Sequence, residues 1–65
     1  MADRISRARA IAAHDITRAI AAWKAAKGRD AKARKRLAGK IRAILHVWQD
    51  DAIVLDAARA AGWRV

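Results

Sequence analysis

The sequence predicts an all-α protein, in which a helical hairpin of two longer helices is closed by a short third helix to form a small three-helix bundle. Three observations lead to this prediction. The chain has no proline and is rich in alanine, arginine and lysine, which favour helix. Its large apolar residues recur near the helical period of 3.6 instead of alternating. Glycine and aspartate stand where this pattern is interrupted, as expected of helix ends.

The first helix is predicted over residues 4–26. Asp3 can cap its N-terminus, with Ser6 as the alternative. Gly28 marks its end, because glycine readily takes the left-handed conformation that terminates many helices. The apolar face expected to point into the core contains Ile5, Ala12, Ile16, Ala19, Ile20 and Trp23.

The second helix is predicted over residues 31–49, with Asp30 as its N-cap. The connection of two or three residues implies that the first two helices are antiparallel neighbours. Gly39 lies on the face opposite the apolar stripe. It is explained either by close approach of a phosphate backbone or another helix, or by easier packing against the first helix. The apolar stripe contains Leu37, Ile41, Ile44, Leu45 and Trp48.

The third helix is predicted over residues 52–61. Asp50 and Asp51 can cap it, or they can lie within one continuous helix. We favour a break, because a continuous helix would turn the apolar residues that follow toward the basic outer face. Gly62 is the expected cap, after which Trp63 either folds back on the last turn or faces a partner. The apolar arc of this helix contains Ile53, Val54, Ala57, Ala58 and Ala61.

Chain length and composition predict one small domain, residues 1–65, with a thin core. The sequence has 65 residues and no cysteine, so neither a disulfide nor a thiolate metal site can add stability. Such a core often gains stability from self-association or from docking on a partner, and a homodimer is one candidate. No apolar run approaches the roughly 20 residues that span a bilayer. The absence of cysteine and of a signal-peptide pattern leads us to expect a cytoplasmic protein.

The charge distribution predicts a positive binding surface. The chain has 15 Lys and Arg against 6 acidic residues, for a net charge of +9. Between Lys24 and Arg42 there are nine cations and one acid, whereas solvated helix faces normally mix both signs. Such a concentration of like charge destabilises a compact chain unless an anionic partner relieves it.

The predicted surface is centred on the second helix and on the turn that precedes it. Lys32, Lys35 and Arg42, together with His46, share the face opposite the apolar stripe. Ile11 and Trp63 are candidate apolar contacts with a partner. The residues expected to contact nucleic acid or an acidic partner are first Lys32, Lys35, Arg36 and Arg42, and then Arg34, Lys27, Arg29, Arg7 and Arg18.

The sequence predicts no enzyme, no cofactor and no metal. Cysteine, glutamate and tyrosine are absent, and few side chains could join an aspartate in a nucleophilic arrangement. His46 and Asp50 have a spacing that suits a pair of metal ligands, but no third ligand accompanies them. The sequence also contains no glycine-rich phosphate loop.

Three functions fit these observations. The first is a nucleic-acid-binding protein that contacts the backbone of DNA or RNA through its Lys/Arg face. The second is a protein-interaction module or inhibitor, of the kind phages and mobile elements encode, that docks on an acidic protein. The third is membrane-surface activity of a cationic amphipathic helix. It agrees least with helices that have aspartate caps and end at glycines. Trp23 and Trp48 fall in core stripes, so we expect no exposed aromatic platform for single-stranded bases.

Overall fold

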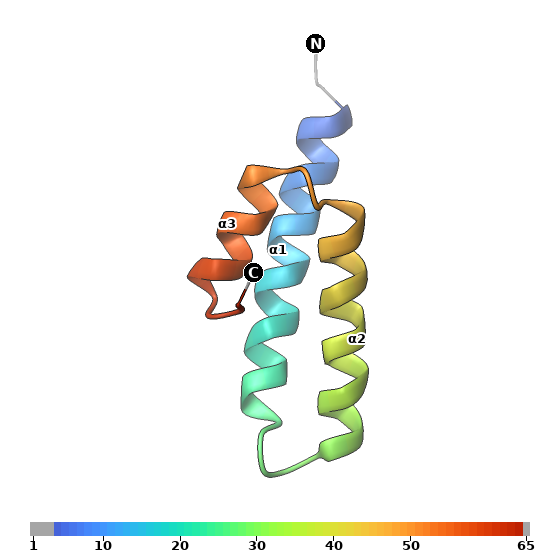
Figure 1. The fold of residues 1–65 in the computed structure, drawn as a ribbon, viewed down its shortest axis with the longest axis vertical. Helices are drawn as coiled ribbons and strands as arrows, with labels where there is room; N and C mark the ends of the chain where they lie inside the picture. The colour runs from blue at the N-terminus through green and yellow to red at the C-terminus, as the bar shows by residue number, and fades with distance from the viewer. Residues whose placement is uncertain (1–3, 65) are drawn as a thin grey trace.

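The computed structural model describes residues 4–64 and confirms the predicted fold class. Three helices follow one another: α1 (Arg4–Ala25), α2 (Ala31–Val47) and α3 (Ala52–Ala60). The chain reverses direction at each connection, so α2 is antiparallel to α1 and α3 runs back in the direction of α1 (Figure 1). The helices end one or two residues earlier than predicted.

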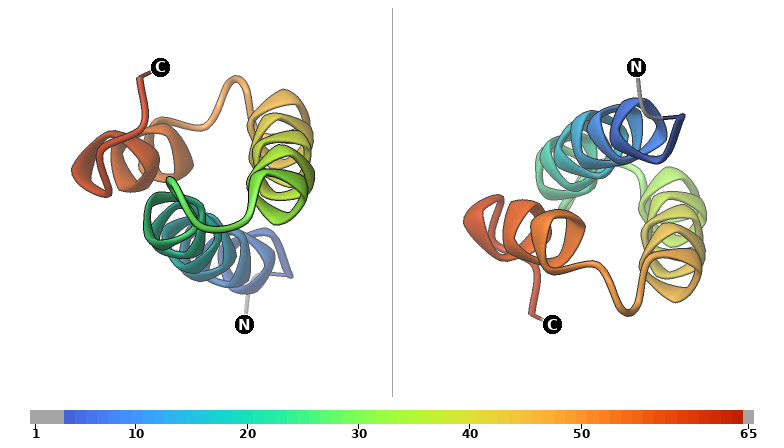
Figure 2. Two further views of the ribbon diagram at one scale, coloured as in Figure 1. Left: turned by 90° about the horizontal axis from the view of Figure 1, so that it is seen from below. Right: turned by 90° about the horizontal axis from the view of Figure 1, so that it is seen from above.

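Helix α1 is the centre of the bundle. Both α2 and α3 pack along it, whereas α2 and α3 make few contacts with each other. Seen end-on, the two shorter helices lie on different sides of α1 (Figure 2). The fold is therefore a helical hairpin to which α3 is attached mainly through α1.

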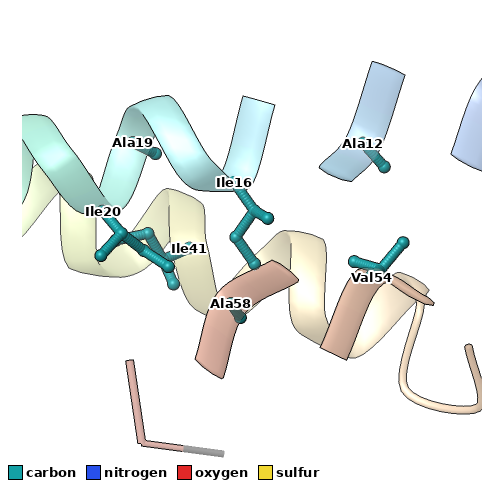
Figure 3. Close-up of a cluster of buried hydrophobic side chains, with 7 residues drawn as sticks. All are labelled: Ala12, Ile16, Ala19, Ile20, Ile41, Val54 and Ala58. Atoms are coloured by element: carbon teal, nitrogen blue, oxygen red, sulfur yellow. The ribbon is translucent and has the colours of Figure 1, made fainter. Parts of the chain in front are cut away.

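The core is small and is built from all three helices. Its four fully buried large side chains are Ile16 and Ile20 of α1, Ile41 of α2 and Val54 of α3. Alanines complete it and allow the helices to lie close together (Figure 3). Half-buried residues, including Trp23, Leu45 and Trp48, pack against its margin. The thin core predicted from the composition is therefore what the structure contains.

Two residues predicted to face the core are exposed instead. Ile5 is 60% exposed because the first turns of α1 extend past the ends of α2 and α3, so no helix lies opposite it (Figure 1). Ile53 is 56% exposed. It precedes the buried Val54, and the turn of about 100° between successive helical residues carries it away from α1. The apolar faces of α1 and α3 are thus shorter or narrower than predicted.

The helix ends follow the predicted chemistry. Gly28 lies in the turn after α1 with a φ of 76°, and the Asp30 carboxylate accepts a hydrogen bond from the Ala33 N–H at 3.0 Å to cap α2. Asp3 lies outside the described residues. After α3, Gly62 has a φ of 100°. Its N–H donates to the Arg59 carbonyl and that of Trp63 to the Ala58 carbonyl, both at 2.9 Å. This pair of bonds is the Schellman arrangement, and it turns the chain back on itself.

The break between α2 and α3 is fixed by Asp51. Its carboxylate caps α3 by accepting hydrogen bonds from the Ile53 and Val54 N–H groups, at 3.0 and 3.1 Å. It also accepts a 2.6 Å hydrogen bond from the guanidinium of Arg9 on α1, and only 12% of its side chain is exposed. The sequence identified Asp51 as a cap but not its partner. Arg9 therefore joins the start of α3 to α1.

The Arg9–Asp51 pair predicts a pH-dependent contribution to stability. The Arg9 hydrogen bond lowers the pKa of Asp51, and the backbone N–H groups of α3 lower it further. Ionised Asp51 therefore stabilises the fold above the pKa it has in the unfolded chain, and this is lost as the pH falls through its lower folded-state pKa. Asp51→Asn keeps a good cap but removes the charge. We expect this variant to be less stable than wild type at pH 7, with the difference shrinking in acid.

Urea unfolding followed by circular dichroism at a series of pH values measures this difference. The matched control is Asp30→Asn, because the Asp30 cap has no cationic partner among the described residues. It is expected to lose less stability at pH 7. A deficit of Asp51→Asn that stayed constant from neutral to acid pH would contradict the assignment.

Candidate functional site

Along α2 and the turn before it the structure displays seven exposed cations, of which Lys40 lies on the flank opposite Arg42 and the other six form one surface. We call these six the basic surface; they are Lys27, Arg29, Lys32, Lys35, Arg36 and Arg42. Within residues 4–64 the ion pairs are Arg9 with Asp51 and Arg59 with Asp56, so no member of the basic surface is neutralised by one. These charges are held on a regular helix and a short turn, and no ion pair within residues 4–64 offsets their mutual repulsion.

The basic surface is elongated. At about 1.5 Å of rise per helical residue, the stretch from residue 29 to residue 42 covers roughly 20 Å. The helical period places Lys32 and Arg36 opposite the buried Ile41, and Lys35 and Arg42 on one flank of α2. The cations therefore cover the outer face of the helix and one of its sides.

Gly39 lies within this surface and packs against nothing. A Cβ added to it would meet no atom within 4 Å, and the residue is exposed. The interpretation that Gly39 eases helix packing is therefore wrong. Its open face leaves room for another molecule to approach the backbone of α2.

Three of the predicted cations do not join the basic surface: the half-buried Arg34 of α2 and two arginines of α1. Arg18 of α1 lines a hollow with Lys40 and Asp15, on the flank of α2 that faces away from Arg42. Arg7 is exposed near the start of α1. Because the hairpin is antiparallel, that end lies far from the turn at residues 27–30 (Figure 1). Ile11, the predicted apolar contact, is 56% exposed on α1.

A second feature lies on the same side of α2 as Arg42. Trp63, folded back after α3, packs edge-to-face on Trp23 of α1 with ring centroids 4.8 Å apart and an interplanar angle of 70°. Two adjoining hollows, of about 370 and 510 Å³, share both tryptophans and Arg42. We call this site the tryptophan groove. Its tryptophans and cations are Trp23, Arg34, Lys35, Arg42, Trp63 and Arg64.

The charged side chains that line the tryptophan groove are all positive. Four of its residues are cations, and no acidic residue is among the described residues that line it. Two of the cations, Lys35 and Arg42, also belong to the basic surface, so the two features are continuous. The groove therefore combines an apolar aromatic floor with a wholly positive rim.

Arg34 differs from the other predicted contact residues. It is half-buried, and its guanidinium carbon lies 3.9 Å from the centroid of the Trp23 ring, a cation–π arrangement. Its Nε is shielded from solvent and has no hydrogen-bond partner among the described residues. Arg34 thus takes part in packing as well as carrying charge.

Sequence reasoning missed the groove, although a signal was present. Trp23 lies five residues before Gly28 and Arg34 six residues after it, which places them opposite each other in an antiparallel hairpin with a short turn. Arg64 follows the tryptophan that the Gly62 cap turns inward. The groove could have been anticipated by pairing these positions across the turn.

Other kinds of site are not found in the described part of the chain. No group of three or more His, Cys, Asp or Glu side chains is placed to hold a metal ion among residues 4–64. None of the helices described has the length and apolar character needed to cross a membrane. Comparison with family models, with curated proteins and with solved structures gives no match to this chain. Fold and site thus define a small three-helix bundle with a basic surface on its second helix.

Proposed function

We propose that the protein binds nucleic acid through contacts of its basic surface with the phosphate backbone. The observation that supports the proposal most directly is the set of six exposed cations that form the basic surface on α2 and the preceding turn, none of them in an ion pair within the described residues. Lys and Arg held in this way can each contact a phosphate oxygen. Such contacts fix the position of a protein on the nucleic acid without selecting a sequence.

The dimensions support the same partner. The basic surface is roughly 20 Å long, and B-DNA carries one phosphate charge for about every 1.7 Å of its axis, counting both strands. A duplex lying along α2 therefore offers on the order of ten phosphates to six cations. The exposed backbone at Gly39, which has no side chain to hold a partner away, lies between Arg36 and Arg42 of this surface.

Fluorescence anisotropy with labelled duplex DNA and hairpin RNA, over a series of salt concentrations, tests the proposal. If all six cations of the basic surface contact phosphates of duplex DNA, the plot of log affinity against log salt has a slope near −5. We expect binding to persist at about 0.15 M salt and to depend little on sequence. Binding seen only at low salt is what a chain of charge +9 shows unspecifically. That result would overturn the proposal in favour of an acidic protein partner.

A further inference from the structure

The tryptophan groove has a composition that helix packing alone does not require. Folding Trp63 back onto Trp23 buries aromatic surface, which accounts for the contact between the rings. It does not account for the cations: Arg42 lines both hollows, Lys35 lines one and Arg64 the other, and no acidic side chain of the described residues lines either. Like charges gathered around a low-dielectric aromatic floor repel one another more strongly than they would in water. An anion bound in the groove would reduce this repulsion.

We propose that the tryptophan groove holds one unpaired nucleotide, with its phosphate at Arg42, which Lys35 flanks in one hollow and Arg64 in the other, and its base against the tryptophans. The choice of a nucleotide over other aromatic anions rests on the proposed function. A phosphate needs cationic donors, and a base needs an aromatic or apolar surface, so that one nucleotide uses both halves of the groove. The larger hollow, at about 510 Å³, is within the range of small-ligand sites.

The arrangement of Arg34 suits this role. Its guanidinium lies over the Trp23 ring, 3.9 Å from the ring centroid. A guanidinium stacked in this way directs its N–H donors outward in its own plane. Arg34 can therefore strengthen the positive potential at the groove without leaving the ring on which it packs.

Continuity with the basic surface indicates how the nucleotide would arrive. Lys35 and Arg42 belong to both features, so a nucleic-acid backbone that follows α2 passes the rim of the groove. A base stacked within a duplex cannot turn into the groove, whereas one in a single-stranded overhang or loop can. The protein is therefore expected to prefer a duplex that carries a short overhang over the same duplex with blunt ends.

Tryptophan fluorescence tests the groove directly. In the Trp48→Phe variant, the remaining tryptophans are the two of the groove. Titration with adenosine monophosphate should give a saturable change in emission, with inorganic phosphate and adenosine each binding about tenfold more weakly or worse. Should Trp48→Phe not fold, the indole N–H signals of the wild-type chain in NMR spectra, assigned by the other Trp→Phe variants, provide the same readout.

Charge-matched variants locate the effect. Arg42→Gln should weaken binding of adenosine monophosphate about tenfold. Arg7→Gln removes the same charge near the start of α1, away from both the groove and the basic surface, and should leave that affinity nearly unchanged. Equal losses in both variants would overturn the groove assignment, because they would show attraction by net charge alone.

The remaining outcomes separate this inference from the proposed function. Equal affinity for inorganic phosphate and for adenosine monophosphate would overturn the nucleotide assignment and leave a simple anion site. If duplex binds while adenosine monophosphate changes no tryptophan signal and an overhang adds nothing, the inference fails and backbone binding stands. If no duplex or hairpin binds at about 0.15 M salt but the mononucleotide occupies the groove, the proposed function fails and the nucleotide site remains.

Discussion

Replacing Lys32, Lys35, Arg36 and Arg42 together by glutamine is expected to weaken duplex binding several hundredfold at physiological salt. Each phosphate contact contributes roughly a fivefold gain in affinity at about 0.15 M salt through the release of counterions. Because these factors multiply, the loss of four contacts gives the several hundredfold decrease in affinity. The salt slope should also become shallower by about 3.6, because each contact contributes about 0.9. Anisotropy titrations over a salt series give both quantities for the same variant.

The matched control removes four cations from elsewhere on the molecule. Arg4, Arg7, Arg18 and Arg59 are exposed and lie outside the basic surface, so their replacement by glutamine lowers the net charge equally. Arg59 makes an exposed ion pair with Asp56, of a kind that adds little stability. This variant should keep most of the affinity and nearly the full slope. Equal weakening of the two variants would mean that binding depends on overall charge rather than on the basic surface.

Replacing Ile16 by alanine is expected to remove a large part of the stability of the fold. Ile16 is fully buried in α1, the helix on which both other helices pack. Truncation of a buried isoleucine to alanine typically costs about 2–5 kcal/mol, because a cavity remains where the side chain was. The whole chain is expected to have a free energy of unfolding of only roughly 3–10 kcal/mol, given its length. Thermal unfolding followed by circular dichroism should show a midpoint lowered by about 10 °C or more.

Ile11→Ala is the control for this prediction. It makes the same chemical change in the same helix, but at a side chain that is 56% exposed. Its free energy of unfolding should stay within about 0.5 kcal/mol of the wild-type value. If Ile16→Ala were as stable as Ile11→Ala, the core would not lie where the structure places it.

The sequence predicted the helices well because each signal acts locally. A carboxylate that caps a helix accepts hydrogen bonds from N–H groups two or three residues ahead, as Asp30 and Asp51 do. Gly62 can adopt a positive φ because glycine has no Cβ. The position of a residue relative to the other helices depends on the tertiary fold, and local signals do not determine it. Ile5 and Ile53 have the right period for the core, but the length of the neighbouring helices and the direction of α3 leave both exposed.

The candidate site was predicted only in part, for the same reason. The cations of the basic surface could be identified because they follow one another along a single helix and its turn. The tryptophan groove draws on α1, α2 and the segment after α3, so its members are brought together by the tertiary fold. Likewise the bond between Arg9 and Asp51 joins residues 42 positions apart, and no short-range pattern pairs them.

The attachment of α3 mainly to α1 has a consequence for how the groove would respond to a ligand. Trp63 and Arg64 follow α3, whereas Lys35 and Arg42 belong to the hairpin of α1 and α2. Local opening of α3 away from α1 would separate these two parts of the groove, at the cost of exposing the buried Val54 and Ala58. An occupant bridging the two parts would shift that opening equilibrium toward the closed form. Docking of the C-terminal segment and ligand affinity would then be thermodynamically linked, and each would strengthen the other.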